Sequence, residues 1–273
     1  MQSVFSTIFS TILLFSAFAG FAAGQDADAK KVQLGSETAK NGFRNEDEIR
    51  DKFNNWKTDK DARAWLKAMG YLLSDIKSVS AGKPHGFKSD VEVIVTTSKG
   101  KKVNGISIKL VSSDNGFNQI DKRWLKTYAK MWNMPADVVA ALKLYVGETP
   151  PDRPSRDPRR MYLKEFEPET QKAVMDFFKK RKDEIVSDLL AGDGDHAAGW
   201  FMVTFKNTDT PRWCILSLAD TIKFYAEGEV VMTRAGNLKI GRISMQRKGG
   251  DNGRETAKML QFKINPADLF EAK

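Results

Sequence analysis

Three residues in the middle of the chain, Asp90, Ser107 and Lys109, have side chains and a spacing suited to phosphodiester hydrolysis. A carboxylate and a hydroxyl are hard oxygen ligands for Mg2+, and an ammonium group can orient water and offset the charge that develops on a phosphoryl group. Because Ser107 and Lys109 are two residues apart, they share one face of an extended strand. The bare pattern is also compatible with Asp90 capping a strand and Lys109 being a solvated surface charge.

The surrounding residues predict a β-hairpin that brings this set together. Valines alternate with other residues over 89–97, which is typical of a strand, and a Ser-Lys-Gly-Lys turn is followed by a second strand over 103–112. If the turn centres near Gly100, the numbers of facing residues sum to about 200 in an antiparallel pair. This register predicts that Asp90 lies beside Lys109, within one residue.

The rest of the chain predicts an α+β fold with an α/β-type core, in which helices flank a mixed sheet. Apolar periodicity indicates helices over residues 45–56, 59–69, 120–131, 135–147 and 168–191. Strands are expected over residues 200–205, 212–218, 230–233, 238–246 and 260–264. Glu46 lies on the first helix, which is expected to pack behind the hairpin, so Glu46 is a candidate ligand of a second metal ion or of its water shell.

The charge balance favours an anionic partner. Lys and Arg number 44 against 35 Asp and Glu, a formal net charge of +9. Nucleic acid, an anionic membrane surface and simple solubility all remain open on charge alone. The loop over 149–160 holds four arginines, which suit phosphates better than bases: Arg153, Arg156, Arg159 and Arg160. The single Cys214 excludes an internal disulfide and is interpreted as a small buried hydrophobe.

The N-terminal residues are set apart from the predicted fold. Residues 1–24 carry no charge, end in small residues and precede a polar linker over 25–31, which resembles a secretory signal. A working signal would make the protein a secreted or periplasmic nuclease. The alternatives are an uncleaved anchor and a misplaced start codon ahead of a cytoplasmic protein.

Six sequence blocks carry a resemblance to a known family. They are residues 34–43, 86–90, 108–112, 116–122, 246–257 and 259–264. These blocks resemble the Hin-P-one-I family of type II restriction endonucleases, within the PD-(D/E)XK nuclease superfamily, and the resemblance runs from about Val32 to Phe270. It implies one restriction-endonuclease-like catalytic domain over 32–273, with DNA-recognition elements inserted in it.

The resemblance also implies an activity and its partners. The expected reaction is Mg2+-dependent hydrolysis of double-stranded DNA at GCGC or a closely related palindrome, with one or two metal ions and 5′-phosphate ends. A cognate DNA methyltransferase would act on the same site without direct contact. The endonuclease itself is expected to be a monomer or a weak homodimer.

The family's metal-site pattern carries over to Ser89, Asp90 and Lys109, and Ile108 joins Asp90, Ser107 and Glu46 among the metal-binding candidates. The chain departs from the pattern at Ser107, where the family carries an amide and the wider superfamily usually a carboxylate. A serine hydroxyl is short and uncharged, so this departure affects the expected catalytic rate and metal affinity more than the fold. It leaves open a DNA-binding protein that no longer cleaves.

Two segments have side chains suited to reading G·C pairs in the major groove, where Arg, Lys and Gln donate to guanine and Asp accepts from cytosine. The first, expected at a loop-to-helix start, contains Asn118, Gln119, Asp121 and Lys122. The second, expected where a strand enters a Gly-Gly turn, contains Gln246, Arg247 and Lys248. A capped surface helix and a solvated hairpin turn are the alternative interpretations.

Overall fold

The computed structural model describes residues 37–192, 194, 196–206, 211–250 and 254–272. Residues Gly42–Lys273 belong to one compact unit. The signal-like segment and the polar linker of the sequence analysis lie outside the described residues. Within the described ranges, no helix has the length and apolar character needed to cross a membrane.

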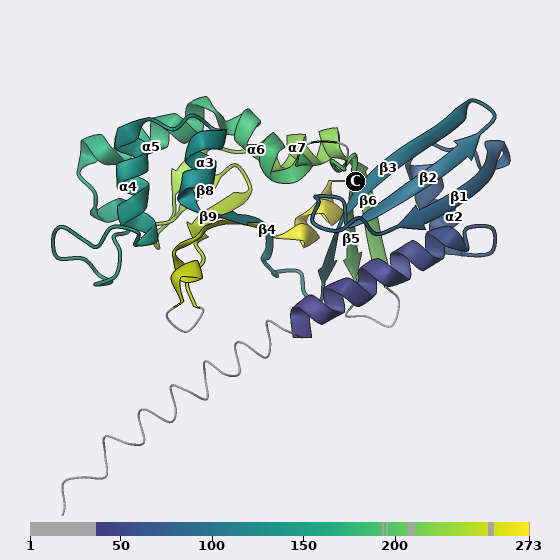
Figure 1. The fold of residues 1–273 in the computed structure, drawn as a ribbon, viewed down its shortest axis with the longest axis horizontal. Helices are drawn as coiled ribbons and strands as arrows, with labels where there is room; N and C mark the ends of the chain where they lie inside the picture. Colours follow the sequence, from purple (N-terminus) through teal and green to yellow (C-terminus); the bar gives the residue numbers. More distant parts are fainter. Residues whose placement is uncertain (1–36, 193, 195, 207–210, 251–253, 273) are drawn as a thin grey trace, which may run out of the picture. The chain divides into compact units, whose positions relative to one another are not determined.

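The first sheet has five strands and contains the predicted hairpin (Figure 1). In sheet order the strands are β1 (Ile76–Gly82), β2 (Val91–Thr97), β3 (Gly100–Val111), β5 (Trp200–Phe205) and β6 (Arg212–Ser217). β3 and β5 are parallel, whereas the other neighbours are antiparallel. This is the predicted mixed sheet, with β1 as a strand that the sequence patterns did not indicate.

The second sheet is antiparallel throughout. In sheet order its strands are β4 (Asn118–Arg123), β10 (Leu260–Ile264), β9 (Ile243–Arg247), β8 (Leu238–Ile240) and β7 (Val230–Met232). The α+β class is confirmed, but the strands expected near the C-terminus form this separate sheet. The single strand expected over 238–246 is a hairpin, because Gly241 turns the backbone at a φ of +55°.

Seven α-helices are described. They are the helix over 37–54, α2 (Lys60–Ala68), α3 (Leu125–Met131), α4 (Ala136–Val146), α5 (Pro168–Lys180), α6 (Lys182–Ala191) and α7 (Leu218–Ala226). Short 3₁₀ turns lie at η1 (Leu73–Asp75), η2 (Leu163–Glu165), η4 (Glu255–Lys258) and η5 (Pro266–Glu271). The helix predicted over 168–191 is two helices, because the backbone leaves helical geometry at Arg181.

The helix predicted over 120–131 is wrong in its first half. Residues 118–123 form β4, and only Leu125–Met131 is helical. β4 pairs with β10, more than a hundred residues later in the chain, so its extended conformation depends on a partner that local periodicity does not reveal. α7 was also missed, although Ser217 caps it by accepting a hydrogen bond from Asp220 N.

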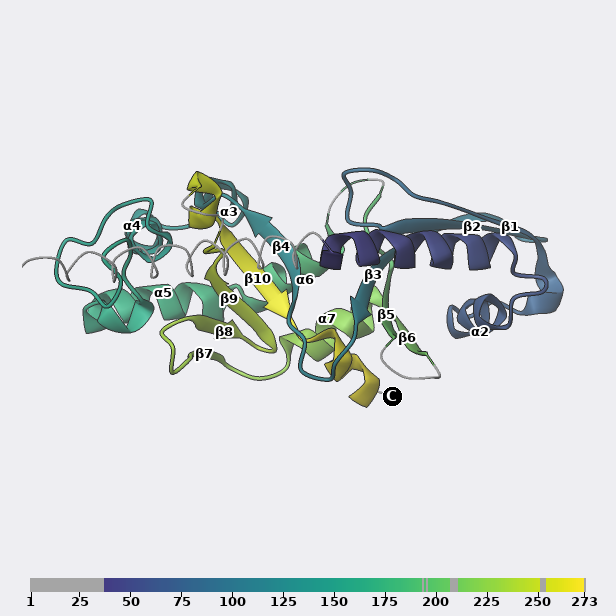
Figure 2. The same cartoon turned by 90° about the horizontal axis from the view of Figure 1, so that it is seen from below.

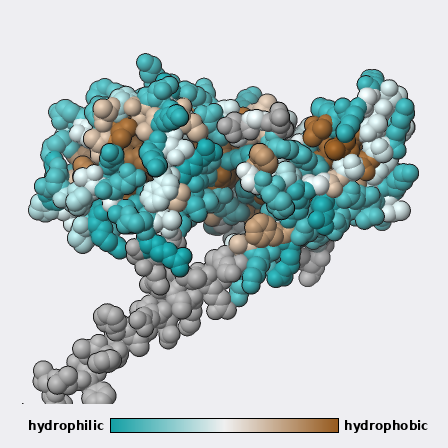
Figure 3. All heavy atoms as spheres, viewed as in Figure 1, coloured by the Kyte–Doolittle hydropathy of each residue, from teal (hydrophilic) through white to brown (hydrophobic). Residues whose placement is uncertain are grey.

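Two buried clusters hold these layers. Around the hairpin, Phe53, Trp65 and Leu66 pack with the inward-facing valines of β2, so α2 and the helix over 37–54 support this sheet (Figure 2). The larger cluster joins α3 to α7 with the second sheet and includes Trp132 and Phe262. The face of the molecule seen in Figure 3 is largely hydrophilic, with few apolar patches.

Candidate active site

The register of the hairpin differs from the predicted one. Thr97 pairs with Gly100 across a tight turn, and Val91 pairs with Ile106. Ser107 is therefore level with Asp90, and the expectation that Lys109 lies beside Asp90 within one residue is wrong, because the two are offset by two residues. The turn is centred before Gly100, which shifts the pairing by about three residues from the predicted register.

The candidate residues nevertheless converge around one oxygen of Asp90. Asp90 Oδ2 accepts a hydrogen bond from Ile108 N at 2.6 Å and another from Ser107 Oγ at 3.4 Å. Lys109 Nζ lies 3.7 Å from the same oxygen and donates to the carbonyl of Ile108 at 2.9 Å. The long lysine side chain therefore reaches back along the strand and compensates for the difference in register.

Ser89, the other residue of the Ser-Asp motif, has a structural position. It is 1% exposed, and its hydroxyl donates to the carbonyls of His196 at 2.9 Å and Ala197 at 3.2 Å. Gly105 packs against it so closely that a Cβ atom there would lie 2.2 Å from Ser89 Oγ. Ser89 therefore fixes the position of Asp90 just before β2, and Gly105, which the sequence patterns did not indicate, leaves the space that Ser89 needs.

Glu46 lies within electrostatic range of the hairpin site. Its carboxylate forms an ion pair with Lys83, with Nζ and Oε2 2.9 Å apart. Burial raises the pKa of Glu46, the charge of Asp90 raises it further, and Lys83 and Lys109 oppose the rise. These interactions agree with the predicted position of Glu46 near the hairpin site.

The oxygen atoms around Asp90 fit a hard divalent cation. The donors are the Asp90 carboxylate, the Ser107 hydroxyl and the Ile108 carbonyl, with Glu46 nearby, and Mg2+ prefers oxygen ligands. Within the described part of the chain, no group of three or more His, Cys, Asp and Glu side chains could hold a metal ion. Such an ion would therefore depend on neutral oxygens and water to complete its coordination.

Lys88, beside the motif, was not singled out from the sequence. Its ammonium group donates to the carbonyls of Ile120, at 2.8 Å, and Leu189, and lies 3.7 Å from Asp121 Oδ2. Burial lowers the pKa of Lys88 to about 8. Lys88 therefore connects the segment before β2 to β4 and α6, and we assign it a structural role in supporting the candidate site.

The first predicted base-reading segment is a strand, which corrects its expected position at a helix start. Asp121 is 9% exposed, and its Oδ1 accepts hydrogen bonds from Tyr128 Oη at 2.5 Å and Arg123 Nε at 3.0 Å. Asn118 Nδ2 donates to the carbonyl of Leu110 at 3.0 Å. The carboxylate of Asp121 is thus engaged by partners inside the protein, which favours a structural role for it over reading of cytosine.

Replacing Asp121 is expected to affect folding. Asp121→Ala leaves the buried Lys88 charge without its counter-ion and the Tyr128 hydroxyl without its acceptor, so we expect the free energy of unfolding to fall by about 3 to 5 kcal/mol. Gln119→Ala, at an exposed position of the same strand, should change it by less than about 0.5 kcal/mol. Urea unfolding measures both. Equal stabilities with lost DNA affinity in Asp121→Ala would instead support base reading.

A polar row crosses the second sheet where the two predicted recognition segments meet. Gln261 pairs with Lys122 on one side and with Gln246 on the other, so the three side chains share one face. Arg247 lies on the opposite face, and its Nε donates to the carbonyl of Val146 at 2.8 Å. Gln261 was not predicted from the sequence, although a glutamine within the apolar strand Leu-Gln-Phe-Lys-Ile was a visible signal.

Comparison with known proteins gives a family and a fold. Residues 69–270 match the family model described as R.HinP1I restriction endonuclease. The structure is similar to a crystal structure of restriction endonuclease MspI in complex with its cognate DNA, with a TM-score of 0.61 and 14% sequence identity over 92% of this chain and 100% of that chain. A search of curated proteins gave no match.

Proposed function

Because the chain belongs to the R.HinP1I restriction endonuclease family, it is a type II restriction endonuclease, and we propose that it hydrolyses double-stranded DNA at GCGC with Mg2+ as cofactor. The proposed products carry 5′-phosphates. Duplex DNA as substrate is supported by the solved complex of MspI with its cognate DNA. A DNA methyltransferase that protects the same sequence is the proposed functional partner, without direct contact.

The observation that carries this proposal is the convergence of Asp90, Ser107, Ile108 and Lys109 at the end of the hairpin. We assign the metal to Asp90, Ser107 and the Ile108 carbonyl, with Glu46 as a ligand of a second ion or of its water shell. A bound divalent ion supplies a Lewis acid and lowers the pKa of water. Lys109 orients the attacking water and offsets negative charge on the phosphoryl oxygens.

Base recognition is proposed for the polar row on the second sheet. Lys122 and the amide of Gln246 provide donors for guanine O6 and N7, and the amide oxygen of Gln246 can accept from cytosine N4. Gln246 and Lys122 are partly exposed, whereas Gln261 is 4% exposed and lies between them. Asn118, Gln119, Arg247 and Lys248 flank this row and are proposed to position the duplex.

Removing an amide from the row is expected to reduce discrimination more than general DNA affinity. For Gln246→Ala we expect cleavage of GCGC to fall by about 10- to 100-fold, since a bidentate base contact contributes about 1 to 3 kcal/mol. Rates on duplexes with one altered base pair should fall much less. Single-turnover cleavage of matched duplexes measures this ratio. An unchanged ratio would exclude Gln246 from base recognition.

The proposed activity is tested with short labelled duplexes that carry GCGC or a single substitution in it. In Mg2+ we expect one discrete product from the GCGC duplex and rates at least about 10³-fold lower on the substituted duplexes, because each mismatched pair costs about 1 to 3 kcal/mol and site-specific enzymes also lose catalytic alignment. Tight, salt-sensitive binding without cleavage would favour the alternative in which Ser107 has left a DNA-binding protein. Cleavage at another palindrome would support the proposed endonuclease activity and would replace GCGC as its recognition sequence.

A further inference from the structure

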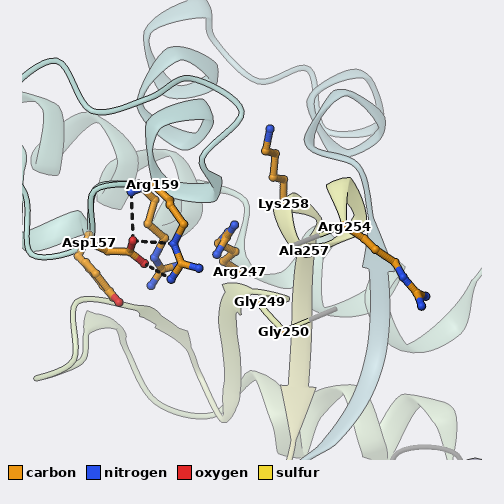
Figure 4. Close-up of a pocket in the computed structure, with 10 residues that line it drawn as sticks. Asp157, Arg159, Arg247, Gly249, Gly250, Arg254, Ala257 and Lys258 are labelled. Carbon is orange, nitrogen blue, oxygen red and sulfur yellow. Dashed lines mark hydrogen bonds and ion pairs between the residues drawn. The ribbon is translucent and has the colours of Figure 1, made fainter. Parts of the chain in front are cut away.

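A pocket lined mainly by cationic side chains lies beside the end of β9 (Figure 4). Its volume is about 340 Å3. The charged residues that line it are Asp157, Arg159, Arg160, Arg247, Arg254 and Lys258. They come from the loop before η2, from β9 and from the η4 turn with its cap. Five cations around one carboxylate give a local field that favours an anionic ligand.

Two of these arginines are held by packing and backbone contacts. Arg160 is 7% exposed, and its guanidinium carbon lies 3.9 Å from the centre of the Tyr162 ring and 5.2 Å from that of Tyr145. Arg247 Nε donates to the carbonyl of Val146. Among the ion pairs of the described residues, neither arginine has a carboxylate partner. A buried guanidinium without a counter-ion is stabilised by binding an anion.

Two of the remaining cations of the pocket are each paired with a carboxylate, and Lys258 Nζ lies 3.0 Å from Glu255 Oε2. Asp157 is engaged by Arg159, with Arg159 Nε and Asp157 Oδ1 3.0 Å apart. Burial lowers the pKa of Arg247, and the charges of Arg160 and Arg159 lower it further. Figure 4 shows Arg159 and Arg247 pointing into the same space, whereas Arg254 extends away from them. The arginines repel one another there, and an anion would relieve the repulsion.

Two glycines, which have no side chain, are also among the residues that line the pocket. Gly249 and Gly250 line it at φ values of +64° and +63°, and an added Cβ at either would meet no atom within 4 Å. Gln246 and Arg247 are consecutive in β9, so their side chains point to opposite faces of the sheet. A duplex at the strand end can therefore present base edges to one residue and its backbone to the other.

We propose that this pocket binds one phosphate group of the DNA backbone and sets the register of the duplex on the base-reading row. The proposal rests on DNA being the substrate, as argued above. Phosphate contacts fix orientation without reading sequence, and arginine forks match phosphate oxygens in pairs. Arg160 and Arg247 form the fixed part of the site, while Arg159 and Lys258 complete it from its rim.

The test compares two double variants of the full chain that each lose two positive charges. Arg159→Gln with Lys258→Gln removes the rim of the pocket, and Arg63→Gln with Lys67→Gln removes two exposed charges of α2. Binding of a GCGC duplex is measured without divalent metal over a series of KCl concentrations. For the pocket variant we expect about tenfold weaker binding, and a slope of log affinity against log salt that is smaller by about 0.9, the value for one phosphate.

A methylphosphonate scan identifies the phosphate. Neutralising the bound position should weaken wild-type binding about tenfold and leave the pocket variant unaffected, because the two changes remove the same contact. The proposal would be overturned if the two double variants had equal salt slopes and the scan found no phosphate whose neutralisation weakens binding. This holds even if the wild type cuts GCGC. Stabilisation by inorganic phosphate alone, with unchanged DNA affinity in the pocket variant, would overturn it too. Since binding is measured without metal, failure to cleave would count only against the proposed activity.

Discussion

Asp90→Asn is expected to reduce DNA cleavage by about 10³-fold or more, because it removes the one carboxylate at the centre of the hairpin site. The substituted amide keeps the size of the side chain and can still accept a hydrogen bond from Ile108 N. It no longer provides a negative charge to hold a divalent ion. Single-turnover cleavage of a labelled duplex in Mg2+ measures the effect.

The same variant should bind DNA at least as tightly as the wild type when metal is absent, because a negative charge near the phosphates has been removed. Asp137→Asn, at an exposed position of α4, is the matched control and should cleave at the wild-type rate. Near-normal cleavage by Asp90→Asn would show that the metal is held elsewhere in the molecule.

Lys109→Ala should have the second-largest effect, with cleavage lower by about 10²- to 10³-fold. The ammonium group is held between the Ile108 carbonyl and the Asp90 carboxylate, and alanine leaves the attacking water and the developing phosphoryl charge without that cation. Raising the Mg2+ concentration should restore little activity, because the variant loses a cation that acts in the hydrolysis step and keeps the residues proposed to bind the metal. Full rescue by Mg2+ would instead show that Lys109 only supports metal binding.

Lys101→Ala provides the control, since it removes an exposed lysine from the same strand, β3. Lys109→Arg distinguishes charge from geometry. The bulkier planar guanidinium keeps the positive charge but cannot reproduce the single contact of the ammonium with Ile108 O. We expect this variant to remain at least about tenfold below the wild type.

The hairpin could be predicted from the sequence because its signals are local. Alternating valines and a turn are sufficient to bring residues 89–97 and 103–112 together, and Asp90, Ser107 and Lys109 did converge. Their register could not be derived, since moving the turn centre by one or two residues shifts every facing pair. Asp90 and Lys109 still meet in spite of the different register, because a lysine side chain spans several ångströms.

The second sheet was beyond local prediction. The spacing of Ile120 and Tyr128 predicts a helix that includes part of β4, whereas the pairing of β4 with β10 decides its conformation. The same pairing buries Asp121 and places Gln261 between Lys122 and Gln246, which changes the set of candidate base-reading residues. Strand pairing decides which side chains share an exposed face of a sheet. Candidate DNA-reading residues on a sheet are therefore better identified from strand pairing than from the charges of one segment.

The N-terminal segment over 1–24 lies outside the described residues, so export through a signal remains a prediction. The mature N-terminus of the expressed protein tests it. Removal of about 24 residues would support export, and that outcome would conflict with a restriction role beside a methyltransferase. An intact apolar segment, or a start further downstream, would be compatible with action on DNA inside the cell.

The central claim is that the hairpin of β2 and β3 cleaves DNA at a defined sequence with a divalent metal. Its most direct test is to digest unmethylated plasmid with residues 25–273 in Mg2+ and to sequence the fragment ends, with Asp90→Asn in parallel. We predict discrete 5′-phosphate ends at GCGC that are absent with the variant or with EDTA. Ends at unrelated sequences, or equal digestion by Asp90→Asn, would contradict the claim.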